Sequence, residues 1–131
     1  HAPSPGLLNV LNHFGSSTFS FKASAIVSYS AGQWGGTRAA IALRPILSEL
    51  GCLPVSAMIH IPHAQTALDE NGKNAMDHNN NDEEEKWRTY CDRCFSQLEW
   101  RATAAKEHRQ QVDPFEESPS FRTSPKERNA P

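Results

Sequence analysis

Length, composition and charge place this chain among ordinary globular proteins with a single core. Its 131 residues are 37% apolar and 21% charged, and the formal net charge is -2. That charge offers no basic surface for nucleic acid or for an anionic membrane. No apolar run reaches the roughly 20 residues of a membrane helix, and the amino terminus lacks the pattern of a secretory signal. We therefore expect a cytoplasmic protein with no nucleic-acid or membrane partner.

The amino-terminal part is predicted to hold a helix and a short strand. Ser4 followed by Pro5 is typical of a helix start, because a serine oxygen accepts a free N–H and proline fits the first turn. Apolar residues then recur at helical spacing, which predicts a helix over residues 5–14. A polar connection follows over 15–20. The strand predicted over 24–29 has a nearly continuous apolar middle, which is typical of a parallel sheet.

A second helix and a second strand come next. Leucine and isoleucine recur at helical spacing after the first strand, and Gly51 is a natural left-handed helix end. Pro45 should kink this helix, because its ring removes one N–H from the helical hydrogen bonds. Apolar and polar residues then alternate over 53–61, which predicts a strand, and Pro54 near its start favours a sheet edge.

Strand, helix and strand together make one βαβ unit with parallel strands, so the predicted fold class is α/β. Two strands cannot bury the inner faces of the three predicted helices, and a parallel sheet is normally covered on both faces. The chain also begins with His1 rather than methionine. We therefore expect further strands upstream of His1.

The remainder is predicted as a connection, a helix and a tail. Residues 62–81 form a connection rich in asparagine, and connections of this length are usually functional or disordered. Asp82 begins a helix whose acidic first turn suits the positive end of the helix dipole, and we expect it to run to about His108. Prolines punctuate the polar tail over 109–131, which we expect to be disordered.

The stretch SYSAGQWGGTRAA, residues 28–40, lies between the first strand and the second helix. Ligands of open α/β sheets bind beyond the carboxyl ends of the strands. Glycines at this place let backbone N–H groups approach a flat ligand such as a flavin or a nucleobase. The alternative is that Gly35 and Gly36 only make a tight turn and that Trp34 packs on a neighbouring loop. The stretch matches neither a P-loop nor the dinucleotide fingerprint.

Several segments, taken in order, resemble the NADPH-dependent FMN reductase family of flavodoxin-like proteins, relatives of chromate, azo and quinone reductases. They are SPGLLNVLNHF, SAIVSYSAGQWGGTRAAIALRPILSELGCLPV, IPHAQTALDENG and FSQLEWRATAAKEHR. The resemblance implies a flavodoxin-like doubly wound parallel sheet, of which residues 1–108 carry only the C-terminal βαβ part and flanking helices. It also implies FMN and NADPH as cofactors, and homo-oligomers. The implied reaction passes a hydride from NAD(P)H through FMN to a quinone, free flavin, metal oxyanion or azo compound.

The resemblance implies where the cofactor binds. The family's phosphate cradle has no counterpart in this chain, and the end of a second flavin loop corresponds to His1, Ala2 and Ser4. A third loop, expected near the isoalloxazine ring, corresponds to Tyr29, Ser30, Ala31, Gly32, Gln33, Gly35 and Gly36. Without the cradle, the charge-assisted hydrogen bonds that anchor FMN are missing, so we expect this chain alone to bind flavin poorly. FMN carries the hydride chemistry, so no catalytic side chain is predicted.

Other reactive side chains have two interpretations each. Cys91 and Cys94 form one CxxC inside a predicted helix, whereas redox motifs of this type begin a helix, so we interpret both as core residues and predict no metal site. His60 and His63, at the end of the second strand, either line the substrate opening or are exposed strand-end residues. Arg38 either meets a phosphate of NADPH or is solvated.

Two functions of different classes remain open at this stage. One is an FMN-dependent oxidoreductase. The other is a flavodoxin-like interaction module that has lost cofactor binding. A thiol redox protein that uses its CxxC is a third, weaker alternative.

Overall fold

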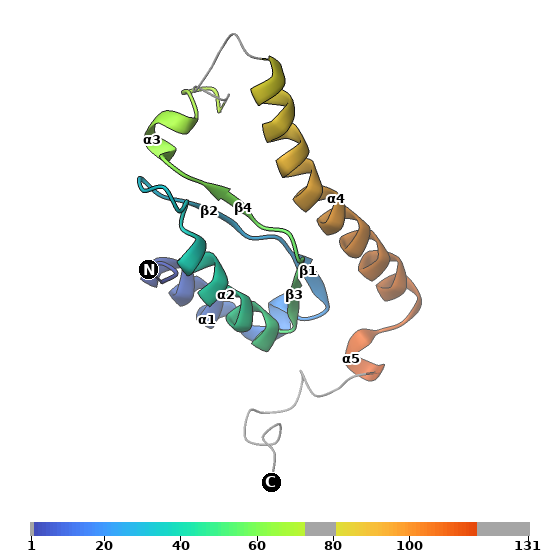
Figure 1. Cartoon of the computed structure of the whole chain (residues 1–131). Helices are drawn as coiled ribbons and strands as arrows, with labels where there is room; N and C mark the ends of the chain where they lie inside the picture. The colour runs from blue at the N-terminus through green and yellow to red at the C-terminus, as the bar shows by residue number, and fades with distance from the viewer. Residues whose placement is uncertain (1, 73–80, 118–131) are drawn as a thin grey trace.

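The computed structural model describes residues 2–72 and 81–117. In chain order its elements are α1 (Pro5–Phe19), β1 (Lys22–Ser24), β2 (Val27–Tyr29), α2 (Thr37–Glu49), β3 (Cys52–Pro54), β4 (Ile59–Ile61), α3 (Ala64–Ala67), α4 (Asn81–Gln111) and α5 (Pro114–Glu117). The strands run between α1 and α2 on one side and the long helix α4 on the other (Figure 1). This is the predicted α/β class with parallel strands. Although α4 is long, none of the described helices is apolar enough over sufficient length to cross a membrane.

Each predicted strand is interrupted in its middle. β1 pairs in parallel with β3, and β2 pairs in parallel with β4. Residues 25–26 separate β1 from β2, whereas residues 55–58 separate β3 from β4. The second strand therefore bulges, with four residues opposite two. The prediction of two continuous strands is wrong at this bulge. The alternation of apolar and polar residues along one strand does not show which residues of the neighbouring strand pair with it.

Side chains from the helices on both sides satisfy the backbone of the bulge, residues 55–58. Arg44 of α2 donates from Nη1 to the carbonyl oxygen of Val55 at 2.9 Å. From the other side, Gln97 of α4 accepts the N–H of Ala57 at 3.0 Å, and the Cys94 thiol donates to the Ala57 carbonyl at 3.3 Å. These bonds replace ladder bonds that the bulge removes, as buried backbone groups require.

Helix α1 begins as predicted, with Pro5 in its first turn and the Ser4 hydroxyl accepting the N–H of Leu7 at 3.3 Å. Gly15 adopts φ +63° and kinks the helix. Residues 16–19 then form a further helical turn, where a polar connection was expected. A glycine at this φ ends one helical segment without strain and lets the next begin at once.

Helix α2 continues through Pro45 as one element, so the proline does not divide it. Gly51 has φ +70°, as the prediction of a left-handed helix end requires. The tight connection between α2 and β3 could therefore be predicted from the glycine at position 51.

Two apolar clusters lie on opposite faces of the strands. The first joins the strands to α1 and α2 and contains Leu11, Ile26, Ala40 and Leu47. The second joins the bulge and β4 to α4 and contains Val55, Ala57, Ile59 and Cys94. Coverage is partial, because Val27 of β2 is 50% exposed and Leu53 of β3 is 59% exposed.

The structure differs from the expectation at both ends of α4. The helix begins at Asn81 and continues past His108 to Gln111. Residues 109–117 were expected to be disordered, but they include the end of α4 and α5. The Phe115 ring of α5 packs edge to face on Phe21, with ring centroids 5.4 Å apart. The rest of the predicted tail, 118–131, and residues 73–80 of the predicted connection lie outside the described residues.

Candidate functional site

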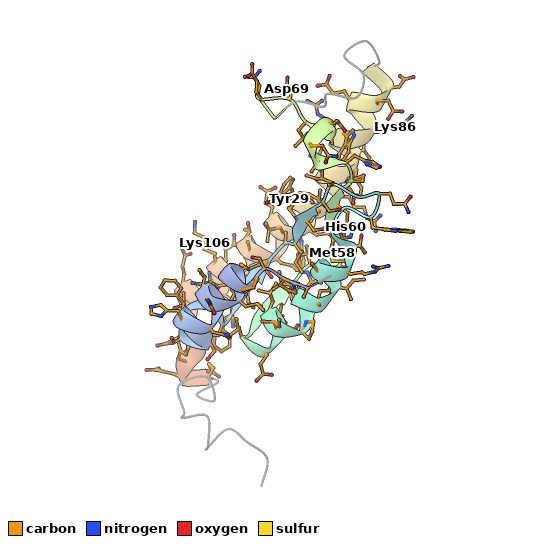
Figure 2. All side chains as sticks on the ribbon, turned by 90° about the vertical axis from the view of Figure 1, so that its left-hand side faces the viewer. Tyr29, Met58, His60, Asp69, Lys86 and Lys106 are labelled. Carbon is orange, nitrogen blue, oxygen red and sulfur yellow. The ribbon has the colours of Figure 1, made fainter. Side chains whose placement is uncertain are left out.

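The glycine loop, defined here as residues 30–36, joins β2 to α2 beyond the carboxyl ends of β2 and β4. Its position follows from the βαβ unit, which delivers this connection to the edge of the sheet where α/β proteins bind ligands. Tyr29, the last residue of β2, and His60 of β4 lie near the same end of the paired strands (Figure 2). The predicted residues 29–36 thus form one continuous feature.

Two glycines of this loop are required by contact with the strand ends. Gly35 has φ +54°, and a Cβ there would lie 2.9 Å from the backbone nitrogen of Ile61. Gly36 has φ +78°, and a Cβ there would lie 3.0 Å from the carbonyl oxygen of Tyr29. A side chain at either position would be strained by the left-handed φ and crowded by the strand backbone, so both glycines let the loop turn tightly against the ends of β2 and β4. This turn is compatible with a ligand-binding role of the same loop.

The turn after β4, residues 61–64, holds the loop through backbone hydrogen bonds. Ser30 donates its N–H to the carbonyl of Ile61 at 3.2 Å, and Ala64 donates to the carbonyl of Ser30 at 3.0 Å. His63, with φ +48°, donates its N–H to the carbonyl of Gly32 at 3.3 Å. His63 therefore contributes to the site through its backbone, a role that its residue type does not indicate.

A row of loop N–H groups faces no protein acceptor. Among the described residues, hydrogen bonds use the N–H groups of Ser30 and Gly35. None is made by the N–H groups of Ala31, Gly32, Gln33, Trp34 and Gly36. Residues 31–34 are exposed. Unpaired donors on an ordered loop suit a ligand with a polar rim.

Beside these donors is a hollow of about 230 Å³, lined by the glycine loop and by the first turn of α2, including Arg38. It is smaller than the roughly 300–1,000 Å³ of typical ligand pockets, so it would receive only part of a flavin. Trp34 is 66% exposed and Tyr29 is 74% exposed. The expectation that Trp34 packs on a neighbouring loop is wrong, since its ring projects into solvent beside the donors.

The described amino-terminal residues of the predicted site lie at the start of α1. Ser4 caps α1, as described above, and Ala2 precedes it. No hydrogen bond within residues 2–72 joins Ala2 or Ser4 to the glycine loop. His1 lies outside the described residues. Residues 29–36 therefore form one segment of the structure, and the cofactor contacts predicted for His1, Ala2 and Ser4 stay predictions.

A side-chain hydrogen bond below the loop was not anticipated. The Ser28 hydroxyl lies 2.7 Å from the carbonyl oxygen of Gly35 and 2.7 Å from Nδ1 of His60. The N–H of His60 in turn donates to the Tyr90 hydroxyl of α4 at 2.8 Å. The sequence held only one signal for this contact, the position of His60 at a strand end. Its partner could not be predicted, because the parallel register of β2 and β4 is what places His60 opposite Ser28.

The two cysteines of the CxxC belong to the apolar packing between α4 and the strands. Cys94 has no exposed surface and Cys91 is half-buried. Burial raises the pKa of both thiols, and the Asp92 carboxylate raises the pKa of Cys91 further. Redox-active thiols need a lowered pKa, so the thiol redox alternative loses its support. Over the described ranges, no group of three His, Cys, Asp or Glu side chains is arranged to hold a metal ion.

Comparison with known families identifies the chain. Residues 1–66, about half of its length, match the NADPH-dependent FMN reductase family. The chain belongs to this family, and so to the oxidoreductases that use NADPH and FMN. The match spans α1 to α3, including the glycine loop and the turn that holds it, whereas α4 lies beyond it. No curated protein and no solved structure matches the chain.

Proposed function

We propose that this protein transfers a hydride from NAD(P)H through bound FMN to a quinone, a flavin or a similar small acceptor. The observation that carries the proposal is the set of unpaired N–H groups on a loop that is hydrogen-bonded to the turn after β4 at the carboxyl edge of the strands. Family membership supports the two cofactors. The class of acceptor is our inference from the resemblance to this family.

The residues of the loop have distinct roles in this proposal. Bound FMN supplies the hydride chemistry, and the protein binds, orients and shields it. The N–H groups of residues 31–34 and of Gly36 donate to the polar edge of the ring. Tyr29 and Trp34 cover its apolar faces and exclude water. His1, Ala2 and Ser4 remain proposed contacts of the same cofactor.

The proposal includes the setting of the site. Residues 1–108 would be the C-terminal part of a flavodoxin-like domain, in a homo-oligomer within the cytoplasm. The exposed apolar side chains of Val27 and Leu53 support further cover on the sheet. The three cysteines, which are all free, support a reducing compartment.

Flavin titration tests the proposal. FMN and riboflavin are each added to the protein while flavin fluorescence is followed, and NADPH is then added to the complex under anaerobic conditions while its visible absorbance is recorded. We expect saturable quenching, of similar strength for both flavins because the described residues offer the phosphate no cradle. We also expect NADPH to bleach the flavin, and a quinone to restore its colour.

Two tryptophan variants give this titration a matched control. Trp34→Ala should weaken flavin binding about 2- to 10-fold, the range expected for loss of an aromatic contact. Trp100→Ala removes a ring that is similarly exposed, at 72%, but lies on α4, and should leave binding unchanged. Because binding without the cradle is expected to be weak, the titration extends to the highest soluble flavin concentration; if neither flavin is quenched by the wild-type protein even there, the interaction-module alternative is favoured instead.

A further inference from the structure

The hydrogen bonds around Ser28 define which atom carries each proton. A hydroxyl has one hydrogen, and a carbonyl oxygen can only accept. The Ser28 hydroxyl therefore donates to the carbonyl of Gly35, at 2.7 Å. It must then accept from Nδ1 of His60, also at 2.7 Å, so the neutral His60 ring carries its proton on Nδ1.

The His60 ring has a well-defined position from which to donate. Its backbone lies in β4, in register with Ser28 of β2, and its N–H is bound by the Tyr90 hydroxyl of α4. Helix α4 and strand β2 thus fix His60 from two directions. The last acceptor in this chain of hydrogen bonds is the Gly35 carbonyl, and Gly35 lies so close to β4 that a Cβ there would be 2.9 Å from the backbone nitrogen of Ile61.

We infer that Ser28 and His60 are positioning residues that hold the glycine loop in its ligand-ready conformation through the chain from His60 Nδ1–H to Ser28 Oγ–H to the Gly35 carbonyl. An ordered loop presents its unpaired N–H groups without a further loss of conformational entropy on binding, which strengthens binding. That the ligand is the FMN ring rests on the function proposed above.

The first test needs no flavin. Nitrogen NMR of the wild-type protein reports which ring nitrogen of His60 is protonated, and we expect Nδ1–H. Amide hydrogen exchange then compares Ser28→Ala, His60→Asn and His60→Gln. The side-chain nitrogen of asparagine occupies the place of Nδ1, whereas that of glutamine occupies the place of Nε2, so only His60→Asn keeps the donor.

We expect the amides of Gly35 and His63 to exchange about 5- to 10-fold faster in Ser28→Ala and in His60→Gln, as the loss of one hydrogen bond implies. In His60→Asn, the exchange rates of the same two amides should remain within about 2-fold of the wild-type rates. The amide of Val55, which binds the Ser24 carbonyl beside β1, should not change. An Nε2–H tautomer, unchanged exchange in Ser28→Ala, or equal acceleration at Val55 would each overturn the inference.

Titration with FMN separates this inference from the proposed function. We expect Ser28→Ala to bind FMN about 5-fold more weakly, with His60→Asn close to wild type. If FMN binds equally well to wild type and Ser28→Ala, the inference fails while the function stands. If exchange follows the expected order but the wild-type protein binds no FMN, the proposed function fails while the positioning of the loop stands.

Discussion

The two ends of the paired strands are built on different principles. At the carboxyl end, backbone and side-chain hydrogen bonds hold the glycine loop against β2 and β4. At the amino end, an apolar groove of about 530 Å³ lies between β1, β3 and the C-terminal half of α4, with Leu53 and Trp100 in its lining. Hydrogen bonds specify one geometry, whereas apolar surface specifies only that something should cover it.

This difference predicts where substitutions act. Changes at the polar end or at the bulge should be costly, because each breaks a defined contact. Changes to exposed aromatic side chains should alter stability little, since these side chains have few protein neighbours. The predictions below run from the largest expected effect on stability to the smallest.

Gly35→Ala should destabilise the protein most, by about 2 to 3 kcal/mol. The new methyl group would lie 2.9 Å from the Ile61 nitrogen, in a left-handed conformation that alanine disfavours. Urea unfolding measures the free energy. Gly32→Ala is the control, because its Cβ would have only the Ser30 hydroxyl nearby, at 4.0 Å, and should change stability by less than about 0.5 kcal/mol. Equal effects of the two substitutions would contradict the close packing of the loop.

Gln97→Ala should reduce the free energy of unfolding by about 1 to 2 kcal/mol, because the N–H of buried Ala57 and the Ser56 hydroxyl both lose their acceptor. Glu99→Ala, at an exposed position of the same helix, is the matched control and should be nearly neutral. Thermal unfolding of both variants and of the wild type measures the loss of stability in each. A neutral Gln97→Ala would mean that the hydrogen bonds of Gln97 do not stabilise the bulge.

The thiols of α4 should react slowly at neutral pH. Their raised pKa leaves less thiolate than in a free cysteine, so alkylation should accelerate only as the pH rises towards that higher pKa. Mass spectrometry after iodoacetamide treatment, with glutathione as reference, should find Cys91 labelled slowly and Cys94 labelled only on unfolding. Cys94→Ser should cost about 1 kcal/mol or less, since serine keeps a donor for the Ala57 carbonyl. Rapid labelling of either thiol at neutral pH would revive the redox interpretation.

Trp34→Gln should have the smallest effect on stability, within about 0.5 kcal/mol, because two thirds of the ring is exposed, at 66%. Chemical unfolding checks this value. A large loss of stability would show that the ring packs within the protein, and would remove it from the proposed ligand contacts.

Much of the fold and part of the site could be predicted from the sequence, because short-range patterns determine them. The capped start of α1, the left-handed Gly51 and the βαβ order each depend on neighbouring residues. The same order placed the glycine loop at the carboxyl edge of the strands. The segment after α4 was not predicted, because its contact with the rest of the protein, Phe115 on Phe21, joins residues far apart in the chain.

Only the tertiary structure decided the bulge and the support of the loop. Gln97 and Ala57 are 40 residues apart, and Ser28 and His60 are 32 apart, so no local pattern announces either contact. The amino-acid sequence by itself determined the order of the main helices and strands and the place of the glycine loop between β2 and α2. The parallel register determined which side chains hold that loop, because a hydrogen bond depends on distances of about 3 Å that only the folded chain sets.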